Sequence, residues 1–155
     1  MQNGADSKEQ KAVSFAGRPT SELQKELEST TNFKKYLADN EKQFVKEPIS
    51  DLLYRHVEAK AIKKSELFRM AEISEVYGYQ ILAGMKHPER NKVISIAVAL
   101  HLDLAETNTL LKRGGYAPLY VKNESDCIIM YGILHGASVL GINEALYDQG
   151  LPTLS

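Results

Sequence analysis

Cysteine is nearly absent from this chain, since Cys127 is the only one in 155 residues. A single cysteine cannot form an intrachain disulfide, and it excludes a Cys-x-x-Cys motif and a Cys/His zinc site. The four histidines are His56, His87, His101 and His135. None of them is followed by another at i+3 or i+4, so we interpret them as surface or boundary residues. We expect no metal site and no cofactor.

Long apolar runs are also missing, and residues 1–11 lack the apolar stretch of a signal peptide. Strand signals are few, because β-branched residues fall at helical spacing and no Asn-Gly or Asp-Gly dipeptide joins two strand-like runs. Ser138 lies near Cys127 and His135 in sequence but has no glycine elbow, and Gly114-Gly115 lacks a phosphate-loop lysine. We therefore expect a soluble, cytoplasmic, all-α protein with no catalytic residues, and not an enzyme.

A strong charge of either sign is the third absence, because the formal net charge is -1. Residues 46–92 carry nine basic and seven acidic side chains, against seven and seven in 1–45 and three and six in 93–155. The chain as a whole thus lacks the positive field of many nucleic-acid binders. Any such contact has to come from a local patch in the middle segment.

What the chain does have is a globular composition, 43% hydrophobic and 25% charged, in a length that suits one domain with an extension. We divide it into an N-terminal arm (1–45), a central domain (46–120) and a C-terminal helical hairpin (121–155). Residues 1–19 are predicted to be a loose arm and 39–46 a polar linker. Between them the spacing predicts two short helices, one capped by Thr20 or Ser21 and one capped by Thr31.

The central domain is predicted to contain five helices. Pro48 precedes an apolar stripe of Ile49, Leu52, Leu53 and Val57, which marks the first helix. Gly84 is expected to end the third helix in a left-handed conformation. The four later helices are predicted at about Lys64–Ala71, Ser74–Ala83, Arg90–Leu100 and Ala105–Lys112.

One internal repeat is visible at an offset of 35 residues, where Asn108–Leu119 aligns with Asn143–Leu154. A repeated helix pair predicts that a second pair, at 123–135 and 138–149, stacks beside the first. The second pair is apolar nearly all round. We therefore expect it to pack on the central domain or across a two-fold axis in a homodimer.

The segment from Pro48 to Leu111 resembles the XRE, or lambda-repressor-like, helix-turn-helix family of bacterial transcription regulators. The residues that carry the resemblance are Leu67, Ile73, Ser74, Ile81, Gly84, Lys86, Pro88, Ile96-Ala97, Leu100 and Leu104. The resemblance implies an all-α helix-turn-helix bundle, here with short N-terminal helices and an added C-terminal pair. It also implies that residues 74–83 form a recognition helix that enters the major groove of double-stranded DNA.

Site residues follow from the same resemblance. Gln80 suits adenine, Glu75 can accept from cytosine N4, and Val76 can contact a thymine methyl group. The phosphate contacts that the resemblance implies are Lys63, Lys64, Ser74, Tyr77, Lys86, Arg90 and Lys92.

Three positions depart from the family pattern, namely Glu72, Gly78 and Leu82. Gly78 replaces a branched core residue, and we expect Tyr77 or Tyr79 to fold over the gap that the missing side chain leaves. Tyr79 is therefore assigned equally to the core and to a DNA contact. Lys63 and Lys64 suit a solvated face as well as a phosphate contact. The alternative function is a helix-turn-helix fold that binds protein and not DNA, with a protein partner at the N-terminal arm or the C-terminal helices.

Overall fold

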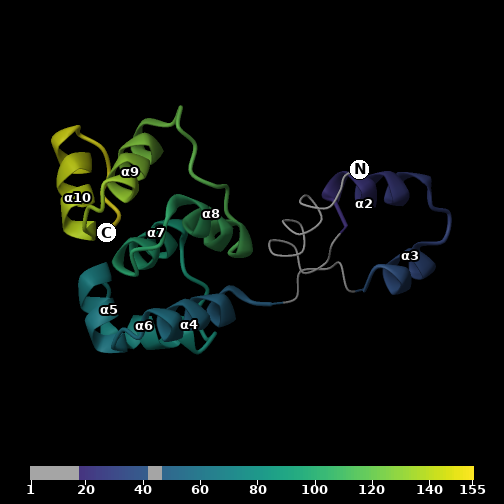
Figure 1. The fold of residues 1–155 in the computed structure, drawn as a ribbon, viewed down its shortest axis with the longest axis horizontal. Coiled ribbons are helices and arrows are strands. Elements are labelled where there is room, and N and C mark those ends of the chain that lie inside the picture. Colours follow the sequence, from purple (N-terminus) through teal and green to yellow (C-terminus); the bar gives the residue numbers. More distant parts are fainter. Residues whose placement is uncertain (1–17, 42–46) are drawn as a thin grey trace. The chain divides into compact units, whose positions relative to one another are not determined.

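All regular structure is helical in the described residues, 18–41 and 47–155, of the computed structural model (Figure 1). This confirms the all-α prediction. The chain divides into two compact units, Met1–Lys46 and Glu47–Ser155. No helix in the described ranges combines the length and apolar character needed to cross a membrane. The helices are α2 (Thr20–Ser29), α3 (Phe33–Asp39), α4 (Ile49–Lys60), α5 (Lys64–Ala71), α6 (Glu75–Leu82), α7 (Arg90–Ala99), α8 (Leu104–Arg113), α9 (Glu124–Leu134) and α10 (Val139–Asp148).

The N-terminal unit contains α2 and α3, whose predicted caps are wrong. Pro19 precedes α2 with no side-chain cap, so neither Thr20 nor Ser21 has that role. Asn32, and not Thr31, caps α3 by accepting a hydrogen bond from a backbone amide in the first turn. Asparagine is among the strongest N-cap residues, ahead of threonine, which explains the choice.

A hydrogen bond and an ion pair join the two N-terminal helices and their flanks. The buried Tyr36 donates its hydroxyl to the carbonyl of Leu23 at 3.0 Å, and Arg18 pairs with Glu26 at 2.9 Å. The predicted loose arm lies outside the described residues except for its last two positions. The predicted linker lies outside them from residue 42 to 46.

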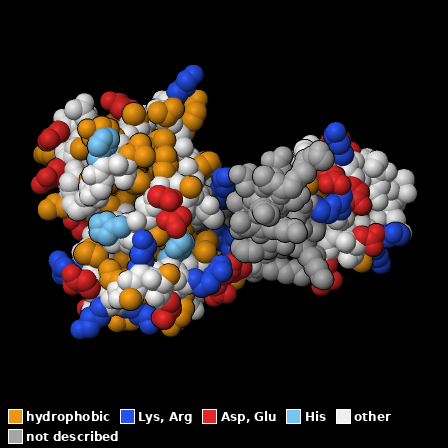
Figure 2. Space-filling view, viewed as in Figure 1, with side chains coloured by type: hydrophobic (Ala, Val, Ile, Leu, Met, Phe, Trp, Pro, Cys, Tyr) orange, Lys and Arg blue, Asp and Glu red, His pale blue; other side chains and the backbone are white. Residues whose placement is uncertain are grey.

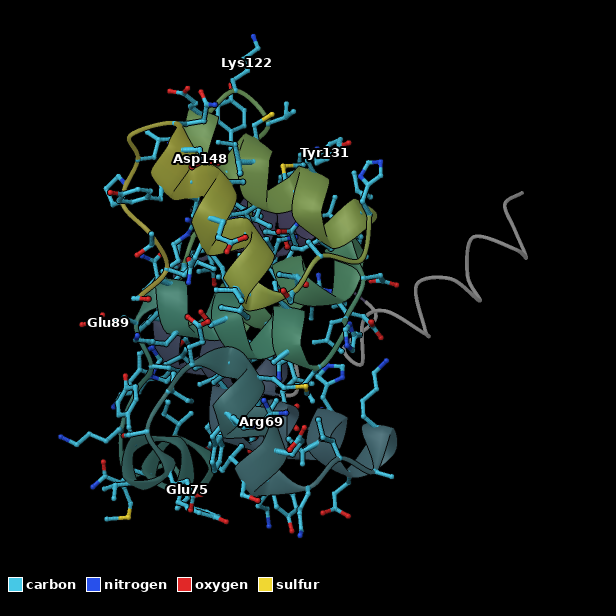
Figure 3. The ribbon with its side chains drawn as sticks, turned by 90° about the vertical axis from the view of Figure 1, so that its left-hand side faces the viewer. Arg69, Glu75, Glu89, Lys122, Tyr131 and Asp148 are labelled. Carbon is cyan, nitrogen blue, oxygen red and sulfur yellow. The ribbon has the colours of Figure 1, made fainter. Side chains whose placement is uncertain are left out.

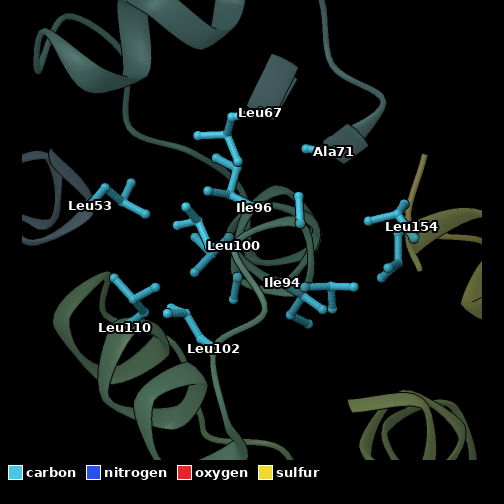
Figure 4. Close-up of a cluster of buried hydrophobic side chains, with 14 of the residues drawn as sticks. Leu53, Leu67, Ala71, Ile94, Ile96, Leu100, Leu102, Leu110 and Leu154 are labelled. Carbon is cyan, nitrogen blue, oxygen red and sulfur yellow. The ribbon is translucent and has the colours of Figure 1, made fainter. Parts of the chain in front are cut away.

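The C-terminal unit is layered, with α7 and α8 between α4–α6 on one side and α9–α10 on the other (Figure 1). Its helices from α5 onward begin and end within one residue of their predicted bounds. α7 is the central helix, because every residue from 93 to 99 is buried. Figure 4 shows Ile96 directed toward Leu67 and Ile94 directed toward Leu154, so α7 serves the core on both sides.

The 35-residue repeat is a structural repeat, as predicted. Asn108 accepts a hydrogen bond from the amide of Leu119 at 2.9 Å, and Asn143 accepts one from the amide of Leu154 at 2.8 Å. In each copy one asparagine thus fastens the tail that follows its helix pair. The second pair packs on the first, with α9 against α8 and α10 against α7. α7 corresponds to α9 and α8 corresponds to α10, so a rotation that exchanges the two copies also exchanges these two contacts. The copies are therefore related by a pseudo-two-fold axis.

His56 on α4 makes stability depend on pH. Burial lowers its pKa from the ordinary 6.5, in opposition to the attraction of Glu106. The folded protein therefore resists a proton that the unfolded chain accepts, so stability is complete above pH 6.5 and falls as the pH drops below that value. We expect urea unfolding at pH 5.5 to show lower stability than at pH 7.5, and His56→Gln to reduce this difference. An unchanged difference would contradict the assignment.

Candidate nucleic-acid interface

The turn between α5 and α6 is three residues long, and its backbone is held in an unusual conformation. Glu72 has φ +59°, a left-handed value that non-glycine residues rarely adopt. This explains why the family pattern favours glycine at the position. The Glu72 carboxylate accepts a hydrogen bond from the buried Asn143 of α10 at 3.1 Å. The second helix pair therefore helps to fix the turn that orients α6.

Gly78 lies against the ring of Phe68, where α6 crosses α5. A Cβ atom added at Gly78 would lie 2.5 Å from two ring carbons of Phe68, far inside van der Waals contact. Phe68 is 1% exposed, so the ring occupies the space that a branched residue at position 78 would fill. The expectation that a tyrosine compensates for Gly78 is thus only partly right. Tyr79 packs edge-on against this ring, with centroids 5.0 Å apart, but Phe68 fills the gap.

The first turn of α6 is ordered and open to solvent. The Ser74 hydroxyl oxygen caps the helix by accepting from the amide of Tyr77 at 3.2 Å. Glu75 is exposed and Val76 is 70% exposed. Gln80 is half-exposed, and its side chain forms no hydrogen bond with a described residue. The three residues predicted to contact DNA bases therefore present atoms that a ligand can reach.

The position of α6 in the C-terminal unit leaves this turn uncovered by α9 and α10. Figure 3 places Glu75 at one end of the unit and Lys122, Tyr131 and Asp148 at the other. α6 packs on α4 and α5 only through its inner face, which carries Gly78 and Ile81. Within this unit the outer face of α6 is therefore free of neighbouring helices.

Lysines flank α6 on both sides in sequence. Lys63 is the exposed N-cap residue of α5, whose first amides receive no side-chain cap. Lys86 is exposed just after α6, and neither lysine forms an ion pair with a described residue. Lys64 is half-buried with its ammonium 5.0 Å from the ring centre of Tyr54, and Lys92 is half-buried on α7. Figure 2 shows basic and acidic side chains mixed along the edge formed by α4–α6, so this edge carries no continuous basic patch.

Arg90 and Tyr77 differ most from their predicted role. The Arg90 guanidinium binds both carboxylate oxygens of Asp126, at 3.0 and 3.1 Å, and also donates to the carbonyls of Ala117 and Pro118. It joins α7 to α9 and has little donor capacity left for a phosphate. Tyr77 is half-buried and packs against the core. Neither residue is therefore expected to contact a DNA phosphate.

Two further exposed residues lie beside the predicted base contacts: Tyr79, which the sequence left open between a core and a DNA-contacting role, and Met85, which was not predicted. Tyr79 is 46% exposed although its ring edge touches Phe68, and Met85 is 72% exposed. The signal for Tyr79 is its position three residues after Val76, which puts both on one helix face. Met85 follows Gly84, whose φ of +78° ends the helix and turns the chain outward.

The described residues offer little support for a metal site. Among the described residues, no group of three or more His, Cys, Asp or Glu side chains is placed to hold a metal ion. The chain matches no family model, no curated protein and no solved structure. The geometry of α5, α6 and their flanks is therefore the remaining guide to function.

Proposed function

We propose that this protein is a sequence-specific DNA-binding transcription regulator that inserts α6 into the major groove, in the manner of the XRE and lambda-repressor-like proteins it resembles. The observation that carries the proposal is the capped and solvent-open first turn of α6, which projects at one end of the C-terminal unit (Figure 3). A helix presented by its N-terminal turn suits the major groove, which is wide enough to admit it.

Base contacts are assigned to the exposed side of α6. The amide of Gln80 can bind adenine with two hydrogen bonds, and the Val76 side chain can contact a thymine methyl group. Glu75 can accept a hydrogen bond from cytosine N4 and repels phosphate, so it favours sites with a cytosine there. Tyr79 adds a hydroxyl with no partner among the described residues.

Phosphate contacts are assigned to groups that flank α6. The uncapped amides at the start of α5 favour an anion, and Lys63 adds a charge beside them. Lys86 supplies a second cation after α6. The Ser74 oxygen is used as an acceptor inside the cap, which leaves its proton available for a phosphate oxygen. Lys64 and Lys92 are partly exposed, and we assign their exposed ends to phosphate contacts as well.

The decisive experiment selects a binding site from a random duplex pool and then measures affinity at several salt concentrations. We expect the double variant Lys63→Gln/Lys86→Gln to bind about tenfold or more weakly, and the salt slope to fall by about 1.8, because two phosphate contacts are lost. Gln80→Ala is expected to lose about 1–3 kcal/mol of discrimination at one base pair.

Lys112→Gln is the matched control, because it removes the same charge from an exposed lysine of α8, outside the α6 region. Its affinity and slope should equal those of the wild type. If no duplex is retained at low salt, or if Lys112→Gln weakens binding as much as the double variant Lys63→Gln/Lys86→Gln does, the proposal is wrong.

A second candidate is a protein-binding use of the same helix. It is favoured by the exposed Val76 next to Glu75 and by the exposed Met85 just after α6, which are more apolar and acidic than phosphate contact requires. In that case a pull-down should recover a partner whose capture is lost in Val76→Asp but unaffected in Lys63→Gln/Lys86→Gln.

A further inference from the structure

The two copies of the repeat bury different amounts of equivalent surface. In the first copy the face directed at α4 and α5 is fully buried, with Val93, Ile96, Leu100 and Leu110 at most 2% exposed. The residues 35 positions later are Ile128, Tyr131, His135 and Ala145. Ile128 is half-buried, and the other three are exposed, Tyr131 by 65%. The second copy therefore lacks the cover that α4 and α5 give the first.

This uncovered face contains a hollow of about 630 Å³. Its apolar lining includes Val121, Cys127, Ile128 and Tyr131, and its acidic rim is Glu124 and Asp148. We call it the α9–α10 face. Val121 is 60% exposed, and the Tyr131 ring is held by stacking on His135 with centroids 4.0 Å apart. An exposed apolar cluster with a polar rim is typical of a protein interface.

Charge indicates which occupant fits. Lys122 lies next to Val121, and Figure 3 shows it at the same end of the unit as Asp148 and Tyr131. None of Lys122, Glu124 and Asp148 forms an ion pair with a described residue. A basic partner would satisfy the two acids but repel Lys122. A second copy, turned about a two-fold axis, supplies a lysine for the acids and acids for the lysine.

We propose that the α9–α10 face is the interface of a two-fold homodimer of this chain. Tyr131, Ile128 and Val121 form its apolar centre, and Lys122 of each copy pairs with the acidic rim of the other. Each second repeat thereby gains the apolar cover that α4 and α5 already give the first repeat.

The dimer has a consequence that rests on the proposed function. Glu75 at the start of α6 lies at the opposite end of the unit from this face (Figure 3). Two copies joined through the face therefore carry their α6 helices at the outer ends of the dimer. Such a dimer binds two separate DNA segments and bridges them, whereas adjacent half-sites on one straight duplex would need the two helices side by side.

The first test measures mass by sedimentation equilibrium of the full chain without DNA. We expect a dimer for the wild type. For Tyr131→Glu we expect the dimer dissociation constant to rise at least tenfold, because a carboxylate would be desolvated at the centre of the interface. Leu140→Glu is the matched control, since Leu140 is 57% exposed on α10 but does not line the hollow; it should remain dimeric. A wild-type monomer at about 100 µM, a concentration roughly a hundred times a micromolar Kd, or a Tyr131→Glu dimer, would overturn the proposal.

The second test uses Cys127, the one cysteine of the chain, which is exposed and lines the hollow. A short bismaleimide should link two wild-type chains at low micromolar protein. Moving the thiol, as in Cys127→Ser/Leu140→Cys, should abolish that product while sedimentation still reports a dimer. Equal linkage in both proteins would show a contact elsewhere and refute this interface.

Bridging is tested separately, by capture of a labelled duplex on beads that carry a second duplex with the selected site. The wild type should capture it, and Tyr131→Glu should bind each duplex singly without capture. If neither duplex is bound, the proposed function fails while the sedimentation result stands. If both are bound but monomeric and dimeric proteins capture equally, the interface has no role in bridging and the end-to-end arrangement is wrong.

Discussion

Asp126→Ala is expected to lower the free energy of unfolding by about 3 kcal/mol, because it leaves the Arg90 guanidinium partly buried and without its anion. The Asp126 side chain is 9% exposed and accepts from Arg90 and from the amide of Tyr120. Its loss therefore removes the link between α7 and α9 and the fastening of the segment before α9. Urea unfolding followed by circular dichroism measures the change.

A matched control is Glu66→Ala, which breaks the ion pair with Arg69 on the surface of α5. Both partners of that pair are exposed, so the expected loss is below about 1 kcal/mol. The pair Arg90→Met/Asp126→Leu should recover much of the stability by replacing the ions with apolar groups. This double variant should also keep its DNA affinity if Arg90 is a structural residue, whereas a large loss of affinity would return Arg90 to the phosphate contacts.

Gly78→Val is expected to destabilise the protein by about 3 kcal/mol, at the upper end for overpacking, although valine is the kind of residue that the family pattern favours there. The reason is the Phe68 ring, whose atoms lie 2.5 Å from an added Cβ. Because Phe68 is fully buried between helices, it has no open space to move into. Differential scanning calorimetry measures the effect.

The sign of this effect should reverse when the ring is removed. Phe68→Ala alone is expected to lose about 3–5 kcal/mol through the cavity it leaves. Adding Gly78→Val to that variant should then raise stability, because valine fills part of the cavity and glycine no longer weakens the helix. If Gly78→Val is destabilising by the same amount in both backgrounds, the two positions are not coupled and this account of Gly78 is wrong.

Helix positions were accessible to prediction because each depends on a few local residues. The Pro48 boundary and the left-handed Gly84 are confirmed, and so is the repeat, which two equivalent asparagines share. The failures are of another kind. Thr31 and Asn32 are adjacent and both suit a cap, but asparagine ranks above threonine, so the sequence itself favoured Asn32 over the predicted Thr31. The partner of Gly78 is Phe68 of the preceding helix, which a local pattern does not identify.

Some residues of the candidate site could likewise be predicted from local sequence, and others could not. The sequence placed Glu75, Val76 and Gln80 on one helix and put lysines on both sides of it. The role of Arg90 depends on Asp126, 36 residues later, and helical periodicity says nothing about a pairing at that distance.

The amino-acid sequence alone was enough to predict that the described part of this chain is helical, where its helices from α5 onward begin and end to within one residue, and that one helix pair occurs twice. Helical spacing, helix-ending residues and repeated residues can each be read without knowing the tertiary packing. Tertiary packing decided which faces are covered: α4 and α5 bury one copy of the repeat and leave the other copy open. It also decided that α6 projects at one end while the open face lies at the other. Whether a surface is buried depends on contacts between helices far apart in sequence, so only the folded structure shows which faces are covered.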